Sequence, residues 1–195
     1  IEAAKNKGYD VLLMDCQLDS HFVQLLESKI ENARFARVDS DTVDNLIPKE
    51  DKSKPELTDE QKEEISTIFK AALPESNEYY VQAENLGAEA APILITQSEF
   101  MRRYREMSAM GGGMNFYGEM PQMYNIIVNM ENPLVGKILA AAELHKDDLA
   151  AFAGNSDMLK QITDLALLAN GMLKGKDLSD FIARSAKVVE DAYLK

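Results

Sequence analysis

The stretch "SDMLKQITDLALLANGMLKGKDLSDFIARSAKVV", residues 156–189, contains two successive helical patterns separated by a break at Gly175. In the first pattern, apolar residues recur every three or four positions, from Met158 through Leu165 to Met172. Its other faces are also apolar, which is too much apolar surface for a helix with one side in water. The sequence therefore predicts a helical hairpin whose first helix is buried on nearly all sides.

This hairpin has little of its own domain left to pack against, because few residues follow it. Since twofold dimers are the commonest protein assemblies, we expect two copies to join through a four-helix interface. The alternative is an ordinary core within one chain. The residues expected in the dimer interface are Leu159, Ile162, Leu165, Leu168, Ala169, Met172, Phe181, Ile182 and Val189.

Upstream of the hairpin, three β-rich runs predict a small three-stranded sheet: "EYYVQAEN" (78–85), "APILITQ" (91–97) and "QMYNIIVNM" (122–130). Thr58 and Gln61 have the spacing of a capping box, which predicts a helix that stops at Pro74. Asn132 followed by Pro133 predicts the start of another helix. The fold class is therefore α+β, with the helical hairpin at its end.

The first part of the sequence predicts a small β-α unit. The apolar run "GYDVLLMD" (8–15) indicates a buried strand, "SHFVQLLESK" (20–29) a helix, and "ARFARVDSD" (33–41) a second strand. A segment rich in proline and charge, roughly residues 45–57, then indicates a linker. We therefore expect one domain over residues 1–50, including the linker, and a second over residues 51–195.

The stretch "FMRRYREMSAMGGGMNFYGEMPQMY", residues 100–124, holds six of the ten methionines. Thr96 and Glu99 have capping-box spacing, so we expect an amphipathic helix that runs out into the three glycines. Methionine adapts to many shapes, which suits a surface for varied partners, but core packing explains the pattern equally well. The apolar residues of this segment are Phe100, Met101, Tyr104, Met107, Met110, Met114, Phe116, Tyr117 and Met120.

Composition and motifs exclude several functions. A net charge of -12 disfavours nucleic acid, and no apolar run is long enough for a membrane span. Cys16, Asp19 and His21 lie close together, but the chain has no second cysteine, so we expect neither a metal site nor catalysis there. The glycines at 111–113 lack the lysine of a phosphate loop. A single cysteine also fits the reducing cytoplasm.

The order of these segments resembles the C-terminal half of the ninety-kilodalton heat-shock chaperones, especially the bacterial HtpG type. The resemblance rests on "KGYDVLLMD" with "LDSHFVQLLES", "APILITQSEFMRRY", "YNIIVNMENPLV" and "LALLANGMLKGKDLSDFIARSAKVV". It implies the end of a chaperone middle domain followed by a C-terminal dimerisation domain. The implied function is the dimerisation and client-binding part of an ATP-dependent stress-response chaperone that assists protein folding in the cytoplasm.

The resemblance also implies particular sites and partners. The nucleotide pocket, with its ATP and Mg²⁺, lies upstream of Ile1 in the family, so we expect no cofactor and no enzymatic activity in this segment. Unfolded client proteins are expected at the amphipathic helix and at Ser20, His21 and Gln24. The end "VEDAYLK" lacks the acidic tail that recruits tetratricopeptide co-chaperones, so we expect none of those partners. The alternative function is a dimeric scaffold domain with one fixed partner.

Overall fold

The computed structural model describes residues 1–16, 18–42, 46, 58–74, 78–98, 101–103 and 123–193. It consists of two compact units, each built from two separate stretches of the chain. The first unit combines Ile1–Lys52 with Thr96–Asn115, and the second combines Ser53–Ile95 with Phe116–Lys195.

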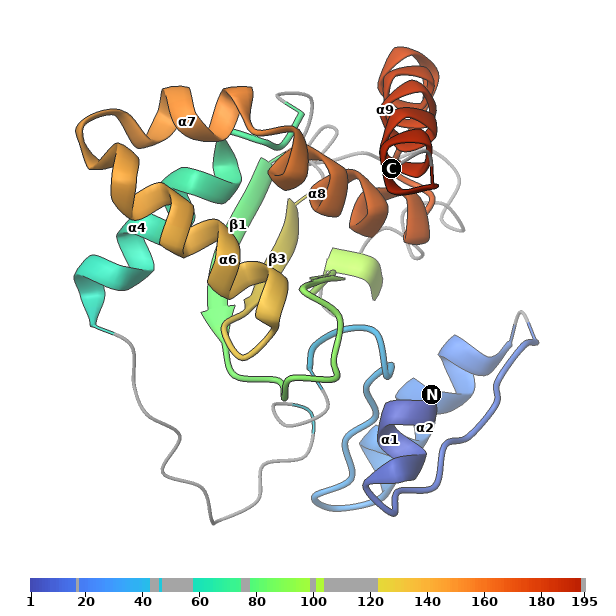
Figure 1. Cartoon of the computed structure of the whole chain (residues 1–195). Helices are drawn as coiled ribbons and strands as arrows, with labels where there is room; N and C mark the ends of the chain where they lie inside the picture. The colour runs from blue at the N-terminus through green and yellow to red at the C-terminus, as the bar shows by residue number, and fades with distance from the viewer. Residues whose placement is uncertain are drawn as a thin grey trace, which may run out of the picture. The chain divides into compact units, whose positions relative to one another are not determined.

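The second unit contains a three-stranded sheet, which confirms the predicted one (Figure 1). Its strands are β1 (Glu78–Glu84), β2 (Ile93–Thr96) and β3 (Met123–Asn129), in the order β1-β3-β2. Strands β1 and β3 run parallel, with Val81 opposite Ile126. The central strand β3 ends in four successive buried residues, which is typical of a strand covered on both faces.

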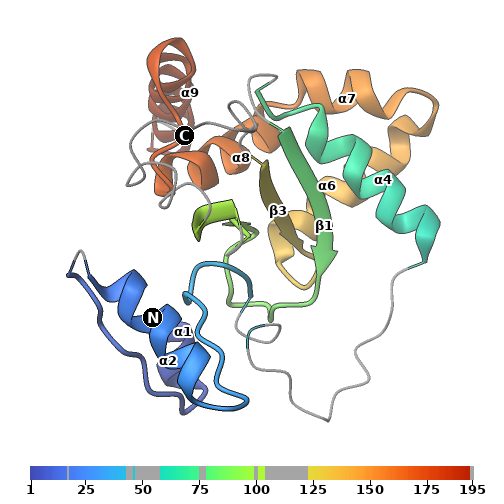
Figure 2. The same cartoon turned by 180° about the vertical axis from the view of Figure 1, so that it is seen from behind.

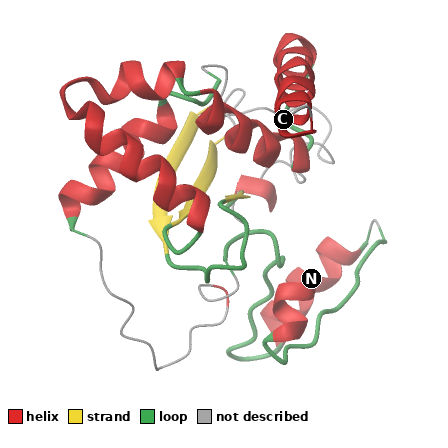
Figure 3. Ribbon diagram, in the orientation of Figure 1, coloured by secondary structure: helices red, strands yellow, loops and turns green. Residues whose placement is uncertain are grey.

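Helices of the same unit lie beside and above this sheet in the view of Figure 3. They are α4 (Asp59–Lys70), α6 (Pro133–Ala142), the 3-10 helix η1 (Glu143–Asp148), α7 (Leu149–Asn155), α8 (Asp157–Ala169) and α9 (Gly175–Tyr193). Helix α4 packs along β1 and against α7. Figures 1 and 2 show α4, α6 and α7 grouped together, while α8 leads away from them to α9. The expected α+β class with a terminal helical hairpin is confirmed.

Local capping explains where two of these helices begin. The Thr58 hydroxyl accepts the Gln61 N–H at 3.2 Å, and the Gln61 side chain accepts the Thr58 N–H at 3.0 Å. At α6 the Asn132 side-chain oxygen accepts the Leu134 N–H at 2.9 Å, with Pro133 in the first turn. Both start signals in the sequence are therefore confirmed.

The core of the second unit lies between the sheet and its helices. It is formed mainly by aliphatic side chains, together with the rings of Phe69 and Phe181, and its almost fully buried members include Ile68, Ile126, Ile138 and Leu159. Because these residues come from α4, β3, α6, α8 and α9, one hydrophobic cluster joins most of the elements of the unit.

A buried asparagine closes one end of the sheet. The Asn129 side-chain oxygen accepts the N–H of Leu86 at 3.1 Å and that of Glu131 at 3.2 Å. Its amide group donates to the Gly87 carbonyl at 2.8 Å. These bonds satisfy the buried polar group and tie the loop after β1 to the end of β3.

The first unit differs from the sequence prediction, because neither expected strand is present. Residues 9–15 and 33–41 have no strand conformation, and Leu12 and Leu13 are 71% and 81% exposed. A strand requires a neighbour for its backbone N–H and C=O groups, and in the described part of this unit no second strand lies beside either run. The apolar pattern alone was therefore insufficient, and the strand predictions are wrong.

The helix predicted in the first unit is present as α2 (Asp19–Lys29), and a short helix α1 (Glu2–Asn6) precedes it. None of the residues of α2 is buried. The large apolar side chains of Phe22 and Leu25 are 51% and 54% exposed. This unit therefore has a helix with an open apolar face rather than a covered one.

The start of the amphipathic segment also differs from expectation. Thr96 is the last residue of β2, and its buried hydroxyl has no hydrogen-bond partner among the described residues. The following helical turn begins later, because the Arg102 N–H bonds to the Ser98 carbonyl at 3.1 Å. Thr96 therefore does not form the predicted capping box, whose other member, Glu99, lies outside the described residues.

Candidate functional site

The two helices of the hairpin are joined by side-chain hydrogen bonds along one side. The Gln161 amide donates to the Ser185 hydroxyl at 2.7 Å, and the Arg184 Nε donates to the Gln161 oxygen at 3.1 Å. Arg184 also forms an ion pair with Asp164, and both side chains are largely buried. Burial raises the pKa of the Asp164 carboxyl, and the hydrogen bond from Arg184 only partly offsets this effect. These contacts fix one side of α9 against α8.

The connection between the helices depends on glycine. Gly171 and Gly175 have positive φ angles of 66° and 58°, a conformation that other residues adopt only with strain. The Gly171 N–H bonds to the Leu168 carbonyl at 3.0 Å and closes the end of α8. The break predicted at Gly175 is therefore present, and the turn before it is tightly defined.

The other side of the hairpin carries exposed apolar residues. Of the 19 residues in α9, only Phe181 is buried. Ile182, Ala186, Val189 and Tyr193 follow one another at helical spacings of four, three and four, so they form a single stripe. All four are exposed, as are Leu165 and Leu168 on α8. We call Leu165, Leu168, Ile182, Ala186, Val189 and Tyr193 the hairpin face.

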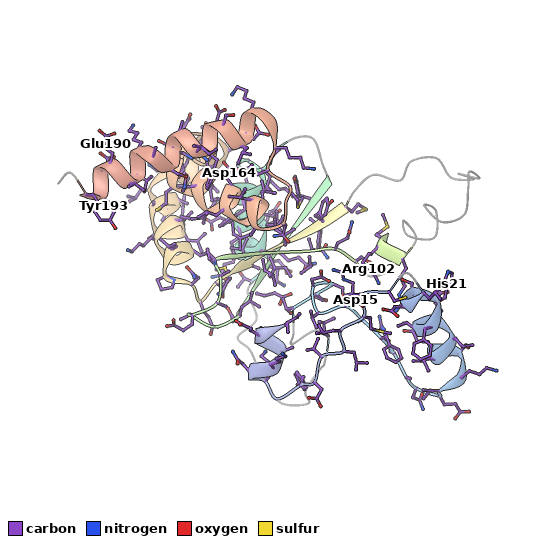
Figure 4. The ribbon with its side chains drawn as sticks, turned by 90° about the vertical axis from the view of Figure 1, so that its right-hand side faces the viewer. Asp15, His21, Arg102, Asp164, Glu190 and Tyr193 are labelled. Atoms are coloured by element: carbon purple, nitrogen blue, oxygen red, sulfur yellow. The ribbon has the colours of Figure 1, made fainter. Side chains whose placement is uncertain are left out.

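Figure 4 shows how far this face extends: Glu190 and Tyr193 lie at the far end of α9, away from Asp164 on α8. Tyr193 is 85% exposed. A helix of this length with an apolar stripe in water is not stable by its own propensity alone, so the stripe is typical of a surface that another element covers.

The nine expected interface residues differ in their burial within the single chain. Three of them, Leu159, Ile162 and Phe181, are buried in the core of the second unit. Met172 is half-buried. The exposed group consists of Leu165, Leu168, Ala169, Ile182 and Val189. Helix α8 thus has two apolar faces, one that packs on the core and one that is exposed in the single chain.

The expected client-binding residues are described only in part. His21 and Gln24 are exposed near the start of α2, and Ser20 beside them is half-buried. Met101 is half-buried in the helical turn 101–103. The remaining expected residues lie outside the described part: Phe100, Tyr104, Met107, Met110, Met114, Phe116, Tyr117 and Met120.

One contact links these two segments, and sequence reasoning missed it. The Arg103 guanidinium donates to both carboxylate oxygens of Glu27, at 2.7 and 3.2 Å, and to the Phe35 carbonyl at 2.9 Å. The hydrogen bond from Arg103, together with that from the Phe35 N–H, lowers the pKa of the Glu27 carboxyl. No sequence signal pairs residues 27 and 103, because many acidic and basic side chains have suitable chemistry.

The neighbouring Arg102 adds a weaker electrostatic contact within the same unit. Arg37 forms an ion pair with Asp39 and lowers the pKa of its carboxyl, and Arg102 lowers that pKa further through its charge. Two consecutive arginines therefore direct the turn 101–103 toward acidic groups of the first unit.

Catalytic chemistry has little support in the described residues. The Asp19 carboxylate accepts the Cys16 backbone N–H at 2.8 Å, a local bond that stabilises the turn before α2. Within the described ranges, no three His, Cys, Asp or Glu side chains form a group that could hold a metal ion. An open concavity of about 510 Å³ is lined by residues including His145, Asp147, Asp148 and Phe152. Because its charged residues are acidic, the concavity does not suit a phosphate group.

The sequence of the chain is similar to that of one family of known proteins. Residues 1–193 match the family model described as Hsp90 protein. The chain is 40% identical to the chaperone protein htpG of Bacteroides fragilis (strain YCH46) over 247 residues, covering 97% of this chain and 36% of the relative. It is 39% identical to the HtpG of Bacteroides thetaiotaomicron and 36% identical to that of Porphyromonas gingivalis (strain ATCC 33277), with the same coverage.

These matches place the chain in the class of molecular chaperones. It spans about a third of the length of the curated relatives, and the aligned stretch of 247 residues is longer than the chain, so the relatives carry additional residues within it. The chain belongs to the Hsp90 family. The resemblance noted in the sequence is confirmed. No helix in the described part is long and apolar enough to cross a membrane.

Proposed function

We propose that this chain is the dimerisation and client-binding segment of an ATP-dependent Hsp90-type chaperone. In this proposal residues 1–50 are the end of the middle domain with its linker, and residues 51–195 are the dimerisation domain. The whole protein acts as a homodimer in the cytoplasm and binds unfolded or partly folded proteins during stress.

The hairpin face is the observation that carries the dimerisation proposal. Ile182 and Val189 are 57% and 55% exposed, although they lie on a regular stripe of a long helix. Burying a large aliphatic side chain fully is worth about 1.5–3 kcal/mol, so leaving this stripe in water is costly. A second copy related by a twofold axis covers the stripe with the same residues, because a twofold interface is self-complementary.

The client-binding proposal rests on adaptable apolar surface in the first unit. Phe22 and Leu25 are more than half exposed, and the methionine-rich stretch follows Met101 in the sequence. Side chains that are flexible and apolar bind many unfolded segments weakly rather than one partner tightly. The expected contact residues on α2 are Ser20, His21 and Gln24.

The nucleotide chemistry of the proposed chaperone belongs to other parts of the protein. The concavity beside Asp147 and Asp148 is acidic, which opposes binding of a triphosphate there. We therefore expect the isolated chain to bind no ATP tightly and to hydrolyse none, and we assign ATP and Mg²⁺ to the whole protein. Calorimetry with MgATP tests this, and micromolar affinity would contradict it.

The competing proposal is a dimeric scaffold with one fixed partner. The two differ in how many partners the chain binds. The test uses reduced, carboxymethylated α-lactalbumin, a protein that stays unfolded, and native α-lactalbumin as the control. A client-binding segment binds the unfolded form weakly and not the native form. Equal binding of both forms, or of neither, contradicts the client-binding proposal while leaving dimerisation open to its own test.

A further inference from the structure

The turn 101–103 follows strand β2 of the second unit in the chain, yet it groups with the first unit. The boundary between the units falls between Ile95 and Thr96. The Arg103 side chain bonds to Glu27 and Phe35, which both belong to the first unit. The methionine-rich segment therefore starts from a point that is anchored on the first unit rather than on the sheet.

The Arg103 contact is stronger than an ordinary surface ion pair. The Arg103 and Glu27 side chains are only 25% and 23% exposed, and two parallel N–H···O bonds join them. Glu27 Oε1 also accepts the Phe35 N–H at 2.8 Å. Bidentate pairs with shared partners define geometry as well as energy, and a lysine cannot reproduce the planar fork.

The anchor lies on the face of α2 that carries two of the expected client contacts. Ser20, Gln24 and Glu27 are separated by four and three residues, so they lie along one side of the helix. The side chain of Glu27 thus holds the turn 101–103 beside the same helix face on which Ser20 and Gln24 lie.

We propose that Arg103 is a positioning residue. By donating hydrogen bonds to Glu27 and to the Phe35 carbonyl, it holds the turn 101–103 against α2. As a result, Gln24 and Met101 belong to one client-binding surface. This inference rests on the proposed client-binding function. Arg103 itself is not proposed to touch the client, since its guanidinium hydrogen bonds are directed at the first unit.

The first measurement is amide hydrogen exchange by NMR on the complete 195-residue chain. The Arg102 amide, bonded to Ser98, reports on the turn, whereas the Ile30 amide, bonded to Leu26, reports on α2. In Arg103→Gln and in Glu27→Gln we expect the Arg102 amide to exchange about tenfold faster, since a charged hydrogen bond is lost, while the Ile30 amide is unchanged. Lys62→Gln, which removes the exposed ion pair with Asp59 in the second unit, is the control.

The second measurement is the affinity of the same variants for reduced, carboxymethylated α-lactalbumin. Arg103→Gln and Glu27→Gln should each weaken binding several-fold, and the double variant no further, because both remove one contact. Arg103→Lys should recover only part of the affinity. Lys62→Gln should bind as the wild type does.

The outcomes separate this inference from the function on which it rests. An unchanged Arg102 amide in both variants overturns the positioning role, and so does equal acceleration of the Ile30 amide, which indicates general unfolding. Faster exchange at Arg102 with unchanged probe affinity overturns the shared surface. If the wild type does not bind the probe, the client-binding function fails and the shared surface with it, while the exchange rates still decide whether Arg103 holds the turn.

Discussion

Replacing Ile182 by aspartate tests the hairpin face directly. In the single chain Ile182 is 57% exposed, so the substitution removes little from the core of the second unit. In the proposed dimer the same position is covered by the partner, and the carboxylate then loses its water. The variant therefore separates dimerisation from folding, which Leu159→Asp would not do, because Leu159 is fully buried in the core.

The expected loss of affinity follows from two contributions. Covering the exposed half of an isoleucine in the interface contributes about 1 kcal/mol to the free energy of dimerisation, and the variant loses this contribution. Removing the aspartate carboxylate from water without a partner opposes dimerisation by at least about 1 kcal/mol more. Symmetry doubles the sum to about 4 kcal/mol per dimer. Since about 1.4 kcal/mol changes an equilibrium tenfold, the dimer dissociation constant should rise about a thousandfold.

Sedimentation equilibrium across the micromolar range measures this constant, and circular dichroism checks that the helices remain folded. The chain offers a matched control in two adjacent valines, Val188 and Val189, which are 53% and 55% exposed. Val189 lies on the stripe, whereas Val188 lies about 100° away around the helix. Val189→Asp should weaken the dimer as Ile182→Asp does, and Val188→Asp should have a much smaller effect.

Two results would refute this reasoning. If Ile182→Asp and Val189→Asp keep the dissociation constant of the wild type, the hairpin face is not the interface. If Val188→Asp weakens the dimer as strongly as Val189→Asp, the stripe does not determine which side of α9 meets the partner.

Three further predictions concern polar contacts. Since Arg103 lowers the pKa of Glu27, their contact should stabilise the first unit fully above pH 4.5, and this stabilisation should be lost as the pH falls through the native pKa. A side-chain NMR titration should show a higher midpoint for Glu27 in Arg103→Gln than in the wild type. An unchanged midpoint would contradict this. Asn129→Ala should lower the free energy of unfolding by about 2–4 kcal/mol in urea titrations, because it leaves buried backbone groups unpaired. Arg184→Met should lower the free energy of unfolding by about 3 kcal/mol, because it leaves the Asp164 carboxylate buried without its partner. The double variant Arg184→Met with Asp164→Leu should recover much of that stability. A double variant no more stable than Arg184→Met alone would contradict this account.

Sequence patterns predicted the second unit well because its signals are local. The Thr58 capping box, the Asn132 cap and the three β-rich runs all depend on residues a few positions apart, and the structure has them where the sequence indicated. The period of α8 showed that it is apolar all round, but a periodic pattern cannot say which apolar face meets the core. For that reason Leu159 and Leu165 were predicted together, although the first is buried and the second exposed.

The first unit was predicted less well because its structure depends on distant partners. The run at Leu12 and Leu13 has the composition of a strand, but strand formation requires a neighbour that composition does not reveal. The contact between Glu27 and Arg103 joins residues 76 positions apart, and the sequence contains many other possible ion pairs. The client residues on the methionine-rich stretch stay a prediction, since most of them lie outside the described residues.

The length of α9 has a mechanical consequence for the proposed dimer. The helix is buried only at Phe181, and its angle is set there by the hydrogen bonds of Gln161 and Arg184. From Phe181 to Tyr193 is about 18 Å along the helix axis, so a tilt of about 10° moves the far end by about 3 Å. A twofold axis applies the same tilt to the partner with opposite sense, and the angle between the two protomers changes by twice as much. Small shifts in the few polar contacts between α8 and α9 would therefore be amplified into a larger change in the angle between the two protomers.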